Sequence, residues 1–338
     1  MDALAIRTAD LRRTYKLPRE RRNQSGTSAP AEFLALDNVS LEVRAGELFG
    51  LLGSNGAGKT TLIKILTTLL APTSGSASVD GLDVISQAQG IRERINMVSG
   101  GETSGYGVLT VRENLWLFSQ IYGVPRKDAN YRIDNLLAAV GMSDRAHTRV
   151  SHLSTGLRQK MNFCRGFVTN PKILFLDEPT LGLDVSAART IRQFVREWMQ
   201  ERPERTLVLT THYMMEADEL CDRVAVIDRG KVLACDKPSV LKRRVQRYPI
   251  FEMALTPGAN GWHDLRNLPG VHQCTLTESS AAVGIKVSLK EEAVVGSVVQ
   301  EVVNGGSRIL SLKKVEPTLE DVFVDLVGHG LRPAEVDA

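Results

Sequence analysis

Hydrophobic positions along this chain fall into short apolar runs separated by segments of helical periodicity. The runs Leu48–Leu52, Ile173–Leu176 and Leu207–Leu209 have the length and composition of buried strands. Between the last two, residues 186–200 place apolar side chains at i, i+3, i+4, i+7 and i+8, which is the stripe of an amphipathic helix. Strands that alternate with helices predict an α/β fold with a mostly parallel sheet covered on both faces.

Weaker patterns extend this picture through the first 240 residues. Residues 1–16 predict a strand followed by a turn, and the polar segment 17–32, with its Pro, Gly and Ser, predicts a flexible insertion. A helix predicted over 60–70 would be ended by Pro72. The remaining predictions are strands at 36–43, 95–98, 223–227 and 231–234, and helices at 111–122, 130–141 and 214–221.

The pattern changes after about residue 240. Apolar alternation predicts strands at 248–255, 271–277, 281–288 and 308–315, and helices at 291–303 and 317–326. Pro317 suits the first position of the last helix. The chain is therefore predicted to hold a first domain at 1–240, a small α+β domain at 241–328 and a frayed tail at 329–338.

Composition narrows the class of protein. With 338 residues, 43% hydrophobic and 24% charged, the chain has the balance of a globular protein of about two domains. A net charge of +3 argues against a general polyanion binder. No apolar stretch approaches the ~20 residues of a membrane span, and the N-terminus lacks the pattern of a secretory signal. Four scattered cysteines favour neither a zinc site nor a disulfide framework, so a reducing cytoplasmic location is expected.

One loop carries phosphate-binding chemistry. It follows the strand 48–52, opens the helix from Thr60 and fits G-x-x-x-x-G-K-[ST]. Its glycines let backbone N–H groups point at phosphate oxygens, the lysine is placed for the β- and γ-phosphates, and the threonine hydroxyl for Mg²⁺. The predicted nucleotide-binding residues of this loop are Gly53, Ser54, Asn55, Gly56, Ala57, Gly58, Lys59, Thr60 and Thr61.

Two further strand ends carry candidate catalytic groups. The run 173–176 ends in Asp177 and Glu178, and the run 207–209 leads into Thr210-Thr211-His212. Ligands bind at the carboxyl ends of parallel strands, so Asp177 is placed to face Mg²⁺ and Glu178 to act on water as general base. Its position alone favours neither of two interpretations of His212: a residue that contacts the γ-phosphate, or a histidine with a purely structural role.

A fourth motif gives these features a family resemblance. Leu153-Ser154-Thr155-Gly156-Leu157-Arg158-Gln159 resembles the signature segment of ATP-binding cassette (ABC) ATPases, and the order of phosphate loop, signature, Asp-Glu, Gly182-Leu183-Asp184 and His212 is specific to them. The resemblance covers about residues 5–240. It implies a P-loop NTPase ABC ATPase domain with a helical subdomain at about 105–165, joined to the small C-terminal α+β domain.

The resemblance also implies an arrangement of the site. Two copies would pair head to tail around two ATP, each ATP lying between the phosphate loop of one copy and Ser154 and Gly156 of the other. Asp184 matches the dimer-contact aspartate and His212 the switch histidine. Tyr15 falls where the family has an aromatic residue that stacks on adenine, although a simple packing tyrosine is the alternative.

The chain departs from the family pattern in two places. The family usually has a glutamine after the strand that ends near Val98, whereas this chain has Ser99-Gly100-Gly101-Glu102. Glu102 could replace it at the metal, since a carboxylate is an adequate Mg²⁺ ligand, or it is a solvated loop acid. Thr155 and Leu157 replace the usual signature glycine and glutamine.

The predicted function is an ATPase subunit, with ATP and Mg²⁺, that energises a separate integral membrane permease. The tail segment 316–323 resembles the end of subunits that export drugs, antibiotics, lipids or polysaccharides. A peripheral position on the cytoplasmic face of the cell membrane is expected, with the permease docked near residues 99–125 and no nucleic-acid partner. The alternatives are a soluble ABC ATPase acting on nucleic acid or ribosomes, and a non-hydrolysing ATP-gated scaffold, which Glu178 disfavours.

Overall fold

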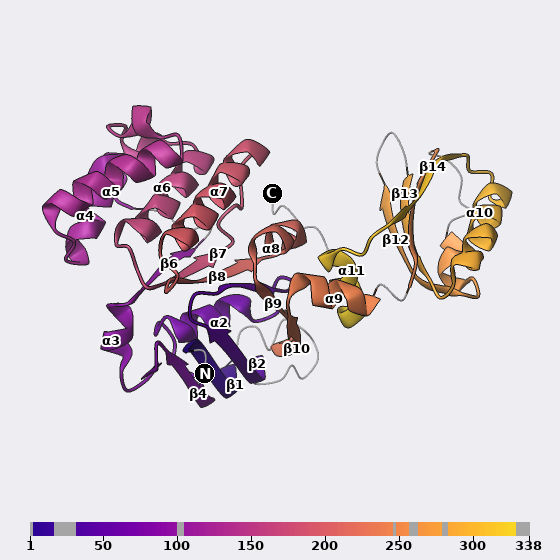
Figure 1. The fold of residues 1–338 in the computed structure, drawn as a ribbon, viewed down its shortest axis with the longest axis horizontal. Coiled ribbons are helices and arrows are strands. Elements are labelled where there is room, and N and C mark those ends of the chain that lie inside the picture. Colours follow the sequence, from indigo (N-terminus) through magenta and orange to yellow (C-terminus); the bar gives the residue numbers. More distant parts are fainter. Residues whose placement is uncertain are drawn as a thin grey trace. The chain divides into compact units, whose positions relative to one another are not determined.

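Contacts divide the chain into two compact units, residues 1–237 and 238–338 (Figure 1). The structure is a computed structural model, and it describes residues 3–16, 32–99, 105–245, 248–256, 263–278 and 283–328. The predicted insertion at 17–32 lies outside these residues except for Glu32, as does the predicted tail at 329–338. In the described part of the chain, no helix combines the length and apolar character needed to span a bilayer.

The centre of the first unit is a six-stranded sheet of order β10-β9-β3-β8-β7-β6, in which only β10 runs antiparallel to its neighbour. Every residue of β3 and β7 is buried, as their uninterrupted apolar sequences predict. Helices α6, α7 and α8 cover one side (Figure 1). The strands are β3 (Leu48–Leu52), β6 (Ile95–Ser99), β7 (Ile173–Asp177), β8 (Thr206–Thr211), β9 (Arg223–Asp228) and β10 (Lys231–Asp236).

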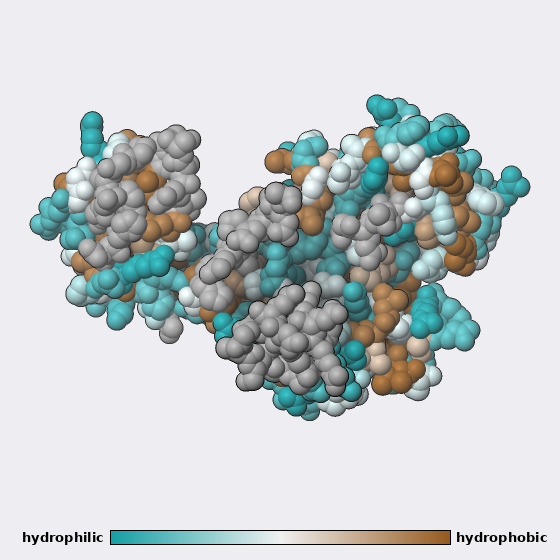
Figure 2. Space-filling model, turned by 180° about the vertical axis from the view of Figure 1, so that it is seen from behind, coloured by the Kyte–Doolittle hydropathy of each residue, from teal (hydrophilic) through white to brown (hydrophobic). Residues whose placement is uncertain are grey.

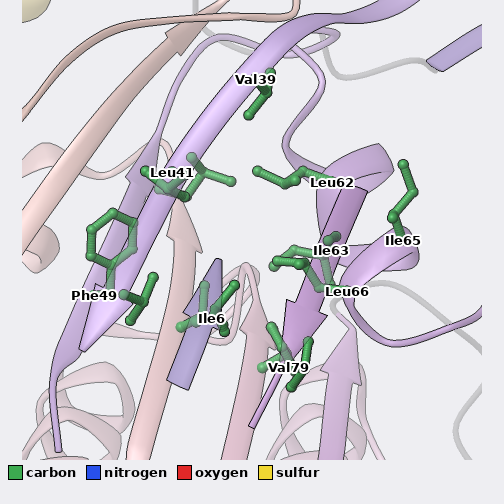
Figure 3. Packing of buried hydrophobic residues seen from close by; sticks show 14 of the residues in the cluster. Ile6, Val39, Leu41, Phe49, Leu62, Ile63, Ile65, Leu66 and Val79 are labelled. Carbon is green, nitrogen blue, oxygen red and sulfur yellow. The ribbon is translucent and has the colours of Figure 1, made fainter. Parts of the chain in front are cut away.

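The other side of this sheet meets a second sheet that the sequence did not reveal. It is antiparallel, with order β2-β1-β4-β5: β1 (Leu4–Lys16), β2 (Glu32–Arg44), β4 (Ser74–Val79) and β5 (Leu82–Asp83). Helix α2 (Lys59–Leu66) packs between the sheets. Figure 3 shows Leu62, Ile63 and Leu66 of this helix on one side of Ile6 of β1 and Phe49 of β3 on the other side, all in one buried cluster. That cluster holds the start of α2 against the strand that precedes the phosphate loop.

Helix α2 is shorter than predicted. It ends at Leu66, because Thr68 has a φ of +62° and the N–H groups of Leu69 and Leu70 both donate to the Lys64 carbonyl, at 2.8 and 3.0 Å. The chain thus leaves the helix before it reaches Pro72, and the prediction that this proline ends the helix is wrong.

A helical layer covers β6 at the end of the main sheet. Helices α4 (Val111–Ile121), α5 (Arg126–Ala139) and α6 (Thr155–Val168) pack on one another, and α6 also contacts β6. Thr110 and Glu113 form a reciprocal capping box at the start of α4, which the sequence Thr-x-x-Glu allows. The remaining helices of this unit are α3 (Ala88–Arg92), α7 (Val185–Glu201) and α8 (Met214–Leu220), with single turns at Ser143–Arg145 and Val150–His152.

The second unit is built on an antiparallel sheet of order β12-β13-β11-β14. Alternate residues of β13 are buried, and one face packs against α10. Helix α11 begins at Leu319, because Thr318 caps it in a reciprocal pair with Asp321, so the prediction that Pro317 takes the first helical position is wrong. The elements are α9 (Pro238–Val245), β11 (Ile250–Leu255), β12 (Val271–Glu278), β13 (Val283–Leu289), α10 (Val295–Asn304), β14 (Ile309–Val315), α11 (Leu319–Val327), and single turns at His263–Asn267 and Glu292–Val294.

Candidate nucleotide-binding site

The phosphate loop joins the central strand β3 to α2, and two of its glycines are required by close backbone neighbours. A Cβ at Gly53 would lie 2.4 Å from the carbonyl oxygen of Ile227. Gly58 has a φ of +107°, and a Cβ there would lie 2.6 Å from the carbonyl oxygen of Ala35. The loop is also held by the N–H of Gly230, which donates to the Ala57 carbonyl at 2.9 Å. Its shape is therefore fixed by strands on both sides.

Lys59 lies buried at the centre of this loop. Its Nζ donates to the carbonyl oxygens of Gly53 at 2.8 Å and Ser54 at 3.2 Å, and lies 3.9 Å from Glu178 Oε1. Burial lowers the pKa of the Lys59 ammonium, and the negative charges of Glu178 and Asp177 partly offset that effect. Asp177 and Glu178 thus favour the charged form of Lys59 in the loop.

Asp177 lies beside the hydroxyl groups of Thr60 and Thr210. Its Oδ2 accepts a hydrogen bond from the Thr60 hydroxyl at 3.2 Å, and its Oδ1 accepts one from the Thr210 hydroxyl. A carboxylate oxygen beside a hydroxyl oxygen, at the mouth of a phosphate loop, is a donor pair that suits Mg²⁺. The structure therefore brings together the two predicted metal ligands that it describes. The third, Glu102, lies outside the described residues.

The next residue, Glu178, faces the histidine predicted from the neighbouring strand. Glu178 Oε2 and His212 Nδ1 are 2.6 Å apart. An ionised Glu178 accepts this hydrogen bond from Nδ1 of His212, because a carboxylate has no proton to donate. Glu178 has a φ of +53°, a strained conformation for a side chain with a Cβ, held by a 3.1 Å hydrogen bond from its N–H to the Thr210 carbonyl. Strain of this kind is common where a side chain must point at a ligand.

The phosphate loop and Glu178 border a cavity of about 270 Å³, whose wall includes neither Asp177 nor His212. Beyond the phosphate loop from Ser54 to Thr61 and Glu178, its wall includes Phe33 and Ala35 of β2. Phe33, 49% exposed, lies directly across from Tyr15 on β1. Tyr15 is not part of the wall, and the Arg13 guanidinium lies 4.8 Å from the centre of its ring. The sequence analysis missed Phe33, whose signal was its position at the start of the alternating strand.

The signature residues lie away from this cavity. Ser154 caps α6 by accepting a hydrogen bond from the Leu157 N–H at 3.4 Å, and Asp184 caps α7 by accepting one from the Ala187 N–H at 2.8 Å. Gly156 packs near Leu183, where even a Cβ would make only ordinary contacts. Within one chain, Ser154, Gly156 and Asp184 therefore contribute nothing to the cavity wall.

Comparison with known proteins agrees with this geometry. Residues 36–181 match the family model described as ABC transporter. The linearmycin resistance ATP-binding protein of Bacillus subtilis (strain 168) is 31% identical over 296 residues, which is 87% of this chain and 94% of that protein. A daunorubicin resistance ATP-binding protein of Streptomyces coeruleorubidus is 34% identical over 302 residues, 89% of this chain and 93% of that protein.

A solved structure extends the agreement to the fold. The structure described as the ATP-binding subunit of an ABC transporter superposes with a TM-score of 0.60 and 26% identity, covering 71% of this chain and 92% of that chain. The motifs, the strand order that gathers them and the relatives that match most of the chain all agree. The chain therefore belongs to the ABC transporter family, as one of its ATP-binding, ATP-hydrolysing subunits.

Proposed function

We propose that this chain hydrolyses Mg²⁺-ATP through Glu178 and His212 and so drives export of a drug or antibiotic through a separate membrane permease. The observation that carries the proposal is the 2.6 Å contact between Glu178 and His212 beside the phosphate cavity. In this assignment Lys59 binds the β- and γ-phosphates, Thr60 and Asp177 hold Mg²⁺, and Mg²⁺ neutralises charge on the phosphates.

Two side chains of this chain, Glu178 and His212, are assigned to the activation of the attacking water. Glu178 is the general base that takes a proton from the attacking water, and its strained backbone keeps the carboxylate at the cavity wall. Nδ1 of His212 donates to that carboxylate and so orients it, and in the doubly protonated imidazolium Nε2 also carries a proton that it can donate to the γ-phosphate. The fixed loop and buried lysine are in place before nucleotide arrives, so little reorganisation is needed during the reaction.

A second copy of the chain completes the site in this proposal. Ser154 and Gly156 begin α6, and a helix N-terminus offers N–H donors that favour an anion. Neither residue reaches the cavity of its own chain, which supports a role towards the ATP of a partner copy. We propose the head-to-tail dimer on these grounds.

The permease is proposed to dock on the helical layer. Exposed apolar and aromatic side chains gather around α4, and Figure 2 shows hydrophobic surface at the end of the first unit that carries α4 and α5. A surface of this kind fits a protein partner. The chain would then be a peripheral protein on the inner face of the membrane. The exposed side chains are Tyr106, Val108, Trp116, Ile121 and Tyr122.

The cargo class follows from the relatives alone. The two relatives described above are named for resistance to linearmycin and to daunorubicin, and each matches at least 87% of this chain, more than its first unit contains. The names of these relatives favour a drug or an antibiotic, rather than a lipid or a polysaccharide, as the exported substrate. They also favour a transport role over an action on nucleic acid or ribosomes.

The substitution Glu178→Gln tests the proposal. Gln keeps the shape of the side chain and removes the base, so the rate of ATP hydrolysis should fall by about 10²–10⁴-fold while ATP binding persists. With ATP and Mg²⁺, the variant should double its mass by light scattering. Glu197→Gln, on the exposed side of α7, is the matched control and should leave both properties unchanged. Parental hydrolysis by Glu178→Gln, or a strictly monomeric variant with ATP, would refute the assignment.

A further inference from the structure

Helix α6, which is capped by the signature residue Ser154, makes a buried contact with the loop that carries the proposed base. Nε2 of Gln159, in the second turn of α6, donates a hydrogen bond to the Pro179 carbonyl at 3.1 Å. Gln159 is 6% exposed, and Pro179 is also buried. A buried carbonyl group that loses its donor is unfavourable, because it has already lost its hydrogen bonds to water. The bond therefore holds the helix and the loop at a fixed separation.

A second contact lies on the same face of α6. Gly156 precedes Gln159 by three residues, and residues with this spacing are neighbours on one side of a helix. A Cβ built at Gly156 would lie 3.7 Å from Cδ2 of Leu183, which is ordinary packing distance. Pro179 and Leu183 both belong to the loop that joins β7 to α7. The first two turns of α6 therefore pack against this loop, whose first residue is Glu178.

Glu178 has a backbone conformation that needs support from its surroundings. Its φ of +53° is strained for a residue with a Cβ, and such a conformation persists only where neighbouring structure fixes it. The N–H of Glu178 donates to the Thr210 carbonyl of β8 at 3.1 Å. The carbonyl of the next residue, Pro179, accepts the hydrogen bond from Gln159. The backbone on the two sides of the base is thus held by two different elements, β8 and α6.

We propose that Gln159 is a positioning residue, through which α6 aligns Glu178 for ATP hydrolysis. The inference rests on the proposed dimer and on the proposed role of Glu178 as the base. In that dimer Ser154 faces the ATP held by the phosphate loop of the partner copy, and it precedes Gln159 by only about 7.5 Å along the helix. So short a piece of helix moves as a unit. The ATP of the partner copy therefore acts, through Gln159, on the base that hydrolyses the chain's own ATP.

The variant Gln159→Met removes the donor and keeps a side chain of similar size and shape. In the full-length chain we expect a kcat for ATP hydrolysis that is lower by about 10–100-fold, because rates are sensitive to small displacements of a catalytic group. The KM for Mg²⁺-ATP should stay within about twofold of the parental value, because Gln159 does not line the nucleotide cavity.

Gln120→Met is the matched control. Nε2 of Gln120 also donates to a backbone carbonyl at 3.1 Å, that of Val124, and neither residue lines the cavity. This variant should keep the parental kcat, and its melting temperature should be close to that of Gln159→Met. Parental kcat in Gln159→Met would overturn the inference. So would a loss of kcat accompanied by a higher KM, or by a melting temperature far below that of Gln120→Met, since either result would indicate a purely structural role.

Mixed dimers, isolated through two different affinity tags, test the route between the two sites. The partner copy carries Lys59→Ala, which removes ATP from its own phosphate loop and leaves its Ser154 for the ATP of the first copy. Per intact site, a parental first copy should hydrolyse ATP more slowly beside this partner than beside a parental one, by about fivefold or more. A first copy with Gln159→Met should have the same rate beside either partner. An equal response of both first copies would contradict the inference.

Glu178→Gln is assayed alongside, so that a failure of this inference can be told from a failure of the proposed function. If Glu178→Gln hydrolyses ATP at the parental rate, the assignment of the base fails. If Glu178→Gln is inactive while Gln159→Met is fully active, the base stands and only the role of Gln159 fails.

Discussion

Adenine recognition is the point at which the structure and the family resemblance give different expectations. The resemblance implies Tyr15, whereas the cavity wall contains Phe33. The two residues pair across β1 and β2, so their side chains lie on the same face of the sheet. Arg13 lies over the Tyr15 ring, and a guanidinium on an aromatic face competes with a base for that face. We therefore expect Phe33 to make the larger contact with adenine.

The size of the effect follows from the exposure of Phe33. An aromatic side chain has about 150–250 Å² to bury, so at 49% exposure about 100 Å² stays open to solvent. A base stacked on one ring face would cover about half of that area, worth about 1 kcal/mol at about 25 cal/mol per Å². Stacking of bases on aromatic side chains contributes about 1–3 kcal/mol. Phe33→Ala should accordingly weaken ATP binding by about 5–150-fold.

Titration of each variant with a fluorescent ATP analogue measures this difference. Phe33→Ala should show the weaker binding just derived, Phe33→Tyr should bind as the parent does, and Tyr15→Ala should change the dissociation constant by less than about threefold. Because Phe33 is half exposed, its replacement should leave the melting temperature nearly unchanged. Full affinity in Phe33→Ala together with a large loss in Tyr15→Ala would refute the reasoning and place adenine on Tyr15.

Two further predictions concern stability. Burial acts to raise the pKa of Asp80, but hydrogen bonds and charges from Lys172 and Arg94 outweigh it, so the pKa lies below its usual value. Because the pKa is lower in the folded state, ionised Asp80 stabilises the fold at pH values above its ordinary range, and this stabilisation is lost as the pH falls through the folded-state pKa. Asp80→Asn should therefore cost about 1–2 kcal/mol in urea unfolding at pH 7, and the cost should shrink as the pH falls below the ordinary pKa of an aspartate. Gly166→Ala would place a Cβ 2.2 Å from Val98 Cγ2 and should lower the free energy of unfolding by about 1–3 kcal/mol. Combining it with Val98→Ala should recover part of that loss in the same assay, and an equal or larger loss in the double variant would contradict this explanation.

Much of the main sheet could be predicted because its signals are local. The apolar runs of β3 and β7 are continuous and bounded by polar loops, which is the pattern of a strand buried on both faces. The stripe of α7 likewise repeats at helical spacing, and its predicted bounds, 186–200, differ from Val185–Glu201 by one residue at each end. The phosphate loop combines both kinds of signal with glycines whose neighbours exclude a side chain.

The antiparallel sheet of the first unit could not be predicted in the same way. Strand β4 reads Ser-Gly-Ser-Ala-Ser-Val, with little apolar material, and it becomes a strand by pairing with β1, about 70 residues earlier. Such pairing depends on tertiary contacts and leaves only a weak local pattern. The end of α2 was missed for a related reason, because a residue with positive φ, Thr68, terminates it where the local sequence has no glycine.

Strand register explains why the proposed catalytic residues could be inferred separately from the sequence but the contacts between them could not. In the parallel pairs, Asp177 lies opposite Thr210 and Leu52 lies opposite Thr211, so the three loops that follow β3, β7 and β8 start at one edge of the sheet. Thr60 and Asp177 are 117 residues apart in the sequence, and yet the Thr60 hydroxyl lies 3.2 Å from Oδ2 of Asp177. The motifs indicate which strand ends carry chemistry, and the parallel register then forces them together.

Phe33 reaches the cavity by another route, which carries no motif. It comes from β2 of the antiparallel sheet and pairs there with Tyr15 of β1. An aromatic residue at the start of an alternating strand is common in such elements and indicates nothing by itself. Only its position in the cavity wall, where it is 49% exposed, distinguishes Phe33 from an aromatic residue that packs in the core. The proposed contact with adenine thus depends on tertiary pairing between strands, and the Phe33→Ala titration measures that dependence directly.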